Sequence, residues 1–178
     1  MHGIIFNQLR GYAQARLGEQ GWERALREAG LPSRMYLAFQ SYPDEEAVAI
    51  VSAASRLSGR SVRFLLEDFG EFLVPGLLKI YRAFLQPEWT ILDIVEHAER
   101  IHERVRRDPN AAPPRLECQR LDAMTTRVVY ASPRRLCGVG IGFVRGLASE
   151  LRQPVDVQEK QCMHEGAPHC VFIVKRIG

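Results

Sequence analysis

A proline-rich segment divides this chain into two parts with different apolar patterns. The segment Asp108-Pro109-Asn110-Ala111-Ala112-Pro113-Pro114 cannot continue a helix, because proline lacks an amide donor and restrains the residue before it. Before it, apolar residues recur every three or four positions, which predicts helices. After it, the pattern predicts two pairs of strands, with a helix between the pairs, at 116–121, 128–130, 136–151 (the helix), 155–157 and 171–174. We therefore expect an α+β fold in which a helical N-terminal part precedes a small four-stranded antiparallel sheet with a helix inserted.

Glycines and prolines mark the ends of the predicted helices. Gly18, Gly30 and Gly59 each follow an amphipathic stretch and can end it. Ser61 can cap a fourth helix, and we expect Pro75 to interrupt that helix. A fifth helix is predicted over about residues 88–107.

Length and composition narrow the class of protein. The 178 residues suit one domain, 1–178, and 46% hydrophobic residues can form a core. No apolar run approaches the roughly 20 residues that span a bilayer, and the first residues lack the features of an export signal, so we expect a cytoplasmic protein without a membrane span. A net charge of +3 is too small to predict nucleic-acid binding. Four cysteines in such a chain do not indicate a disulfide scaffold.

One histidine lies on the apolar face of the fifth predicted helix. That face comprises Ile91, Ile94, Val95, Ala98, Ile101, His102 and Val105. His97 lies about 140° away around the helix, on the polar side. A buried imidazole without a partner costs about 1–3 kcal/mol. Two interpretations of His102 remain open: a core histidine bonded to a carbonyl, or a metal ligand such as the axial ligand of a haem iron.

Three hydrogen-bond donors follow the strand predicted at 128–130. Alternate residues of an extended segment share a face, so Tyr130, Ser132 and Arg134 project together. Two hydroxyls and a forked guanidinium can hold a carboxylate or a phosphate. An ordinary strand end with a surface arginine is the simpler alternative.

Together these motifs resemble a known family. The matching segments are Met1-His2-Gly3-Ile4-Ile5-Phe6-Asn7, Tyr42-Pro43-Asp44-Glu45, Phe69-Gly70, Ile101-His102, Pro113-Pro114 and the triplet Tyr130-x-Ser132-x-Arg134. The sequence is similar to the heme–nitric oxide/oxygen binding (H-NOX) domains, the bacterial relatives of the sensor domain of soluble guanylate cyclase. The resemblance implies haem b (protoporphyrin IX iron) enclosed by the fold, with His102 as axial iron ligand and Tyr130, Ser132 and Arg134 on the propionates.

The resemblance also implies a haem pocket and a division of the domain. Pro114 would pack against the porphyrin, and the pocket would further include Ile5, Leu9, Leu77, Val139 and Phe143. Residues 1–60 would form the helical distal part, and 61–178 the proximal helix plus the sheet.

The residue at position 139 predicts which gas binds. Oxygen-binding members of the family carry a tyrosine five positions after the motif arginine, whereas Val139 here cannot donate a hydrogen bond. We expect a sensor that binds nitric oxide at ferrous haem, with CO as a further ligand and little O₂ binding. It would have no catalytic activity and would signal to a separate histidine kinase or diguanylate cyclase.

The cysteines near the C-terminus give an alternative function. Some family members carry a zinc or thiol-redox site here, and Cys137, Cys162 and Cys170 match its spacing. Glu159 replaces the expected histidine, although Glu159, His164 or His169 could supply a fourth ligand. The alternative is therefore a haem-independent zinc or thiol-redox switch; reduced cysteines in a packed hairpin are the simpler interpretation. We rank last an enzyme acting on a porphyrin-like molecule, because no nucleophile–base pair is evident.

The glycine-rich run at 138–142 does not complete a dinucleotide-binding motif. We expect its small residues to let this helix approach the sheet and the pocket closely.

Overall fold

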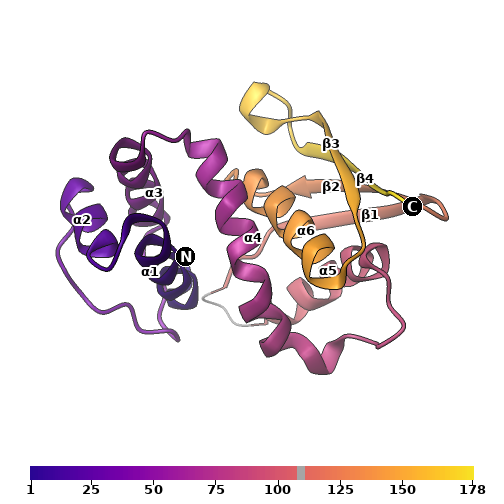
Figure 1. Cartoon of the computed structure of the whole chain (residues 1–178), viewed down its shortest axis with the longest axis horizontal. Coiled ribbons are helices and arrows are strands. Elements are labelled where there is room, and N and C mark those ends of the chain that lie inside the picture. Colours follow the sequence, from indigo (N-terminus) through magenta and orange to yellow (C-terminus); the bar gives the residue numbers. More distant parts are fainter. Residues whose placement is uncertain (108–110) are drawn as a thin grey trace.

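The computed structural model describes residues 1–107 and 111–178 and has the predicted α+β architecture (Figure 1). Its helices are α1 (Gly3–Leu17), α2 (Gly21–Glu28), α3 (Asp44–Ser58), α4 (Val62–Tyr81), α5 (Ile91–Val105) and α6 (Cys137–Leu151), with short 3-10 turns η1 (Arg82–Phe84) and η2 (Met163–Glu165). Its strands are β1 (Arg115–Asp122), β2 (Thr125–Ala131), β3 (Val155–Gln161) and β4 (Cys170–Arg176). Part of the predicted proline break, 108–110, lies outside the described residues. No helix among the described residues is long and apolar enough to cross a membrane.

The four strands form one antiparallel sheet in the order β1-β2-β4-β3. The two predicted strand pairs are confirmed: β1 pairs with β2, and β3 pairs with β4. The central pairing of β2 with β4 joins the two hairpins, with Val128 opposite Phe172. The inserted helix α6 packs with α5 and the sheet in the C-terminal half of the molecule (Figure 1).

Local capping explains where several helices begin and end. Gly18 and Gly59 follow α1 and α3 with φ of 87° and 68°, conformations that favour glycine. The Ser61 hydroxyl accepts a hydrogen bond from the Phe64 amide, 3.1 Å away, as expected for the start of α4. Helix α5 begins at Ile91, where Thr90 and Asp93 form a capping box.

The predicted interruption at Pro75 is wrong. Helix α4 continues through Pro75 to Tyr81 without a break. Pro75 is exposed, so its ring lies in solvent, and it leaves only the carbonyl of Glu71 without its helical amide partner. Packing of α4 against α6 at Gly146, beside Glu71, supports the helix at this point.

Helix α4 stands between two hydrophobic cores (Figure 1). The N-terminal core is built by α1, α2 and α3 with the Leu65, Phe69 and Leu73 side of α4. The C-terminal core is built by α5, α6 and the sheet, and includes Val74 of α4. One helix therefore contributes side chains to both cores.

The glycines of α6 let it approach α4 rather than the sheet. A Cβ on Gly142 would lie 1.8 Å from the Glu67 carbonyl oxygen, and one on Gly146 would lie 2.6 Å from Val74. Gly70 of α4 is equally close to α6, since its Cβ would lie 2.2 Å from the Val139 carbonyl oxygen. The expected close approach to the sheet is therefore wrong, since a Cβ on Gly140 would lie at an ordinary 3.9 Å from the sheet side chains Tyr130 and Phe172.

Candidate functional site

The two cores meet along a boundary of half-buried apolar side chains. Four of them, from α1, α4 and α6, pack at the edge of the N-terminal core: Ile5, Leu77, Val139 and Phe143. Phe143 also packs against the C-terminal core. Leu9 lies deeper, 4% exposed within the N-terminal core. These five predicted pocket residues thus come from three helices that meet where the cores adjoin.

The apolar face of α5 changes character along its length. Its first half is buried in the C-terminal core through Ile91, Leu92, Ile94 and Val95. Its second half, with Ile101 and Val105, is only half-buried. The apolar face predicted from the spacing is therefore buried only in its first half, because the C-terminal core packs against the first two turns of this helix. Apolar side chains that remain partly uncovered beside a core offer surface for an apolar ligand.

His102 lies in this second half of α5. Its side chain is 26% exposed, and its buried Nδ1 has no hydrogen-bond partner within the described part of the chain. The nearest carboxylate oxygen, Oε2 of Glu99, is 4.0 Å from Nδ1. Burial lowers the pKa of His102, which favours the neutral imidazole that can bind a metal.

Glu99 is held in place by its own partners. It accepts a hydrogen bond from the Leu116 amide, 2.8 Å away, and one from Arg106. Arg106 also donates to the carbonyl oxygen of Pro114 over 3.1 Å. The predicted porphyrin contact Pro114 is therefore linked to α5 through the Glu99–Arg106 ion pair. Sequence reasoning missed Glu99, although its position one turn before His102 was a usable signal.

The donor triplet lies at the end of β2, where the structure brings its members together. Tyr130 and Ser132 are 4% and 8% exposed, and the Ser132 hydroxyl accepts a hydrogen bond from the Arg134 amide. Burial raises the pKa of Tyr130 to about 12, so its phenol keeps the proton that it can donate. The Arg134 guanidinium donates to Asp44 Oδ2 over 2.7 Å and to the Ala112 carbonyl.

Asp44 was also missed as a functional partner. It pairs with Arg134 and with the N-terminal ammonium of Met1, whose nitrogen is 2.6 Å from Asp44 Oδ1. Asp44 begins α3, so this ion pair connects the N-terminal helices to the loop before α6. The guanidinium of Arg134 is thus already held by a carboxylate from α3, on the N-terminal side of the molecule.

Three tyrosine hydroxyls of the N-terminal core are committed to other partners. Tyr12 donates to Asp68, Tyr36 to Glu46 and Tyr42 to Gln40. Because each hydroxyl already donates its proton to another residue, none of the three serves as an additional donor at the boundary between the cores.

The predicted cysteine site comes together beside α4. The three thiols are free and buried: Cys137 begins α6, and Cys162 and Cys170 lie in the β3–β4 hairpin. The sulfur of Cys162 lies 3.9 Å from each of the other two sulfurs. Two thiolates about 2.3 Å from a tetrahedral zinc would be about 3.8 Å apart, close to the observed spacing. Burial raises the pKa of Cys137 and Cys170, so without a metal these thiols stay protonated and weakly nucleophilic.

Glu159 lies where it could supply an oxygen as the fourth ligand. One of its carboxylate oxygens and the three sulfurs all lie within 4.8 Å of one another. Its Oε1 is buried without a hydrogen-bond partner among the described residues, while Oε2 accepts from Arg63. His164, an alternative fourth ligand, is exposed and its Nε2 bonds the Arg135 carbonyl.

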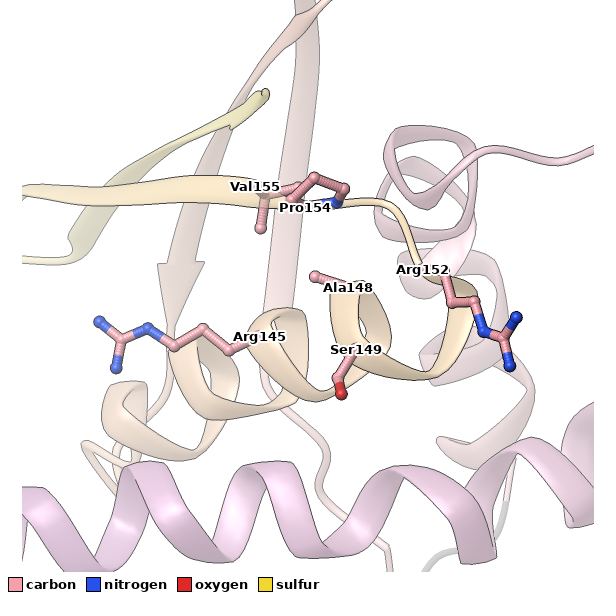
Figure 2. A pocket seen from close by; sticks show the side chains of 6 residues that line it. All are labelled: Arg145, Ala148, Ser149, Arg152, Pro154 and Val155. Carbon is pink, nitrogen blue, oxygen red and sulfur yellow. The ribbon is translucent and has the colours of Figure 1, made fainter. Parts of the chain in front are cut away.

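Two surface hollows are lined by other residues, although the second includes Glu99 beside His102. One, of about 350 Å³, is lined by Arg145, Ala148, Ser149, Arg152, Pro154 and Val155 (Figure 2). Its two arginines point to opposite sides and do not converge on a ligand position (Figure 2). The other, of about 520 Å³, is lined by Glu99, Arg115, Leu116, Glu117, Arg127, Val129, Ala131 and His169. Neither contains a predicted haem contact or a cysteine.

Comparison with known proteins agrees with the resemblance seen in the sequence. The Haem-NO-binding family model matches residues 2–159. An H-NOX protein from S. oneidensis in the Fe(II)NO state is 28% identical, with a TM-score of 0.91 and complete coverage of both chains. The NMR structure of the Shewanella oneidensis H-NOX domain in the Fe(II)CO state is also 28% identical, covers 100% of this chain and 99% of its own, and has a TM-score of 0.87.

A more distant structure supports the fold alone. A mutant of the T. tengcongensis H-NOX is 16% identical, with a TM-score of 0.89 over 100% of this chain and 98% of the other. Among curated proteins, the comparison finds no match.

Proposed function

This chain belongs to the Haem-NO-binding family, whose H-NOX members are haem-based gas-sensor domains, and from that premise we propose that it senses nitric oxide, binds little O₂ and signals to a separate protein. The observation that carries the proposal is His102, a half-buried imidazole whose buried Nδ1 has no hydrogen-bond partner among the described residues, on the half-buried apolar face of α5. A neutral histidine beside uncovered apolar side chains fits an axial ligand of a haem group.

The remaining contacts follow from the chemistry of haem b. Bound haem would supply the iron at which a diatomic gas binds. His102 would hold the iron, while Tyr130, Ser132 and Arg134 would donate to the propionate carboxylates. Ile5, Leu9, Leu77, Pro114, Val139 and Phe143 would exclude water from the macrocycle.

Gas selectivity rests on the lack of a donor at position 139. Bound O₂ gains from a hydrogen bond, and valine has none to give. The hydroxyls of Tyr12, Tyr36 and Tyr42 already donate to other residues, so they do not compensate for Val139. The binding of NO, and of CO as a second ligand, does not depend on such a donor.

Absorption spectroscopy of the reduced protein, prepared with haem, tests the sensor proposal. We expect a Soret band that shifts with NO and is unchanged in air, and that is lost in His102→Ala and restored by added imidazole. His97→Ala is the matched control, because His97 lies in the same helix but stacks on Trp89. Protein that binds no haem, or binds it equally well without His102, would refute the assignment.

Val139→Tyr tests the selectivity separately. The added phenol should allow an oxy complex to form, whereas Val139→Phe, which adds the ring without the hydroxyl, should not. A stable oxy complex in the unmodified protein would contradict this part of the proposal.

We propose that the partner is a histidine kinase or a diguanylate cyclase. His102 lies in α5 beside the Glu99–Arg106 pair, which gives a displacement of the imidazole a route to that helix and to this pair. The test is the rate of kinase autophosphorylation, or of cyclic dinucleotide synthesis, with and without NO. A rate that ignores both this protein and NO would remove that partner class.

The cysteine cluster supports a second function, a zinc site at Cys137, Cys162, Cys170 and Glu159 alongside the haem site. The supporting observation is the set of four ligand atoms within 4.8 Å of one another, including a carboxylate oxygen without a partner. Such a site would stabilise the β3–β4 hairpin against α6. Metal analysis should find one zinc per chain, lost in Cys162→Ser; no zinc and no response to oxidants would exclude both a metal site and a thiol switch.

A further inference from the structure

We propose that Arg63 is the positioning residue that turns Glu159 into the oxygen ligand of the three-cysteine cluster. The inference rests on the zinc site proposed above and adds a residue from α4, far from the cysteines in sequence. It explains how a glutamate can serve where the spacing pattern of the resembling sites calls for histidine.

The two oxygens of Glu159 have different surroundings. Oε2 lies 3.0 Å from Nη1 of Arg63, which donates to it. Oε1 is buried and has no partner among the residues that the structure describes. A buried carboxylate oxygen without a partner is costly, so the arrangement calls for a cation or a donor at that position.

Arg63 is held in a geometry that leaves this second oxygen free. Its Nε donates to Glu67 one turn later in α4, so the guanidinium divides its donors between two carboxylates. An arginine that bound Glu159 through both fork positions would occupy both oxygens. Instead Glu159 is fixed through one oxygen, and its carboxylate lies close to three sulfurs.

The charge of Arg63 also suits a site of this composition. Three thiolates and a carboxylate around a divalent ion leave an excess of negative charge inside the protein. A guanidinium bonded to one of the ligands offsets part of it, more effectively at a partly buried site than in water. Glu159 is only 20% exposed, so solvent screens this interaction incompletely. Partners bonded to metal ligands commonly change metal affinity by 10–100-fold.

The experiment measures zinc affinity by competition with a chromophoric chelator, on haem-loaded protein whose Soret band reports an intact fold. We expect Arg63→Met to weaken zinc binding by 10–100-fold and Arg63→Lys to weaken it less. Arg145→Met is the matched control, since Arg145 also pairs with Glu67 but does not pair with Glu159. It should change zinc affinity less than twofold.

Two further measurements separate positioning from general stability. With Co²⁺ in place of zinc, Arg63→Met and Glu159→Gln should alter the visible absorption bands in the same way, because both disturb the oxygen ligand. In a Glu159→His background, Arg63→Met should have no further effect, because the imidazole ligand does not need the arginine.

The outcomes are distinct. If the unmodified protein binds zinc but Arg63→Met matches Arg145→Met, or acts equally in the Glu159→His background, the role of Arg63 is refuted while the zinc site stands. If the unmodified protein binds neither zinc nor Co²⁺, both the site and the role of Arg63 are refuted, and the haem assignment is untouched.

Discussion

Two places in the molecule are packed very differently. At the crossing of α4 and α6, Gly70, Gly142 and Gly146 bring the two backbones into direct contact. Along the second half of α5, Ile101, His102 and Val105 are only half-buried, and Ile101 and Val105 belong to neither core. The first place leaves no room for an added methyl group. The second leaves apolar side-chain surface uncovered by either core.

This difference assigns the two places different tasks. A glycine-lined crossing fixes how the halves are oriented, because even a Cβ cannot be added without moving backbone. A loosely covered apolar helix face contributes little to stability but can bind an apolar group. Sequence changes at the crossing should therefore affect the free energy of unfolding, and changes on this face of α5 should affect haem binding.

The largest expected effect is that of Gly142→Ala. Its Cβ would lie 1.8 Å from the Glu67 carbonyl oxygen, so the helices must separate, and we expect a loss of about 3 kcal/mol or more in the free energy of unfolding. Gly140→Ala is the control on the same helix, because its nearest neighbours are 3.9 Å away; it should be neutral or stabilising by up to about 1 kcal/mol. Urea denaturation measures the free energy of unfolding of both variants. Equal losses would show that the crossing of α4 and α6 is not an unusually tight contact.

The next effect compares the two halves of α5. Leu92 is 0% exposed in the C-terminal core, so Leu92→Ala should cost about 2–5 kcal/mol. Ile101→Ala, in the half-buried part, should cost less than about 1 kcal/mol in protein prepared without haem, yet should weaken haem binding. Urea denaturation and haem titration give the two readouts. Equal losses of stability would show that the second half of α5 is packed like a core.

Arg134→Gln should accelerate haem loss by about tenfold. A charged hydrogen bond to a carboxylate is worth about 1.5–3 kcal/mol, and part of that remains with glutamine. The control is Arg135→Gln, because the neighbouring Arg135 is exposed and both residues precede α6. Transfer of haem to apomyoglobin, followed by absorption, gives the rates. The same rate for both variants would exclude Arg134 as a propionate contact.

The smallest effect concerns the pH dependence of the Asp44 ion pair. Burial alone would raise the pKa of Asp44, but hydrogen bonds from Arg134 and the N-terminal ammonium outweigh it and hold the pKa below its ordinary value. The stabilisation is therefore present above the ordinary pKa of about 3.9 and is lost as the pH falls through the lower value in the folded protein. Asp44 is 39% exposed, so screening limits the gain to at most about 1 kcal/mol.

The measurement is the free energy of unfolding of Asp44→Asn at pH 7 and pH 3. The variant should be less stable than the unmodified protein at pH 7, with a smaller difference at pH 3. Glu45→Gln, at an exposed neighbouring residue, is the control and should show no such convergence. A difference that grows on acidification would contradict the sign.

Local patterns in the sequence predicted the elements better than the contacts between them. Apolar residues at alternate positions predicted the strands, and apolar residues every three or four positions predicted the helices. Ser61 marked the start of one helix and Gly59 the end of another. These signals succeed because they act within a few residues. Pro75 misled, because packing of α4 against α6 overrides a local helix-breaking tendency. The half-burial of Ile101 and Val105 could not be read from their spacing, since a periodic stripe shows which residues share a face and not what covers it.

The candidate sites show the same limit. His102, the Tyr130 triplet and the cysteines carry recognisable chemistry at recognisable spacings. Glu99, Asp44 and Arg63 act through partners from other elements, and a single charged residue has no spacing that reveals its partner. Only the tertiary structure pairs Arg63 with Glu159.

The sharing of α4 between both cores bears on how the chain unfolds. Helix α4 has 20 residues and is about 30 Å long, and it packs Leu65, Phe69 and Leu73 into one core and Val74 into the other. Unfolding of either core removes the side chains that pack on one side of α4. The helix is then less stable, and the other core loses part of its support. The protein should thus lose its structure in one cooperative transition, and neither half should persist as an independently folded fragment after cleavage between α3 and α4.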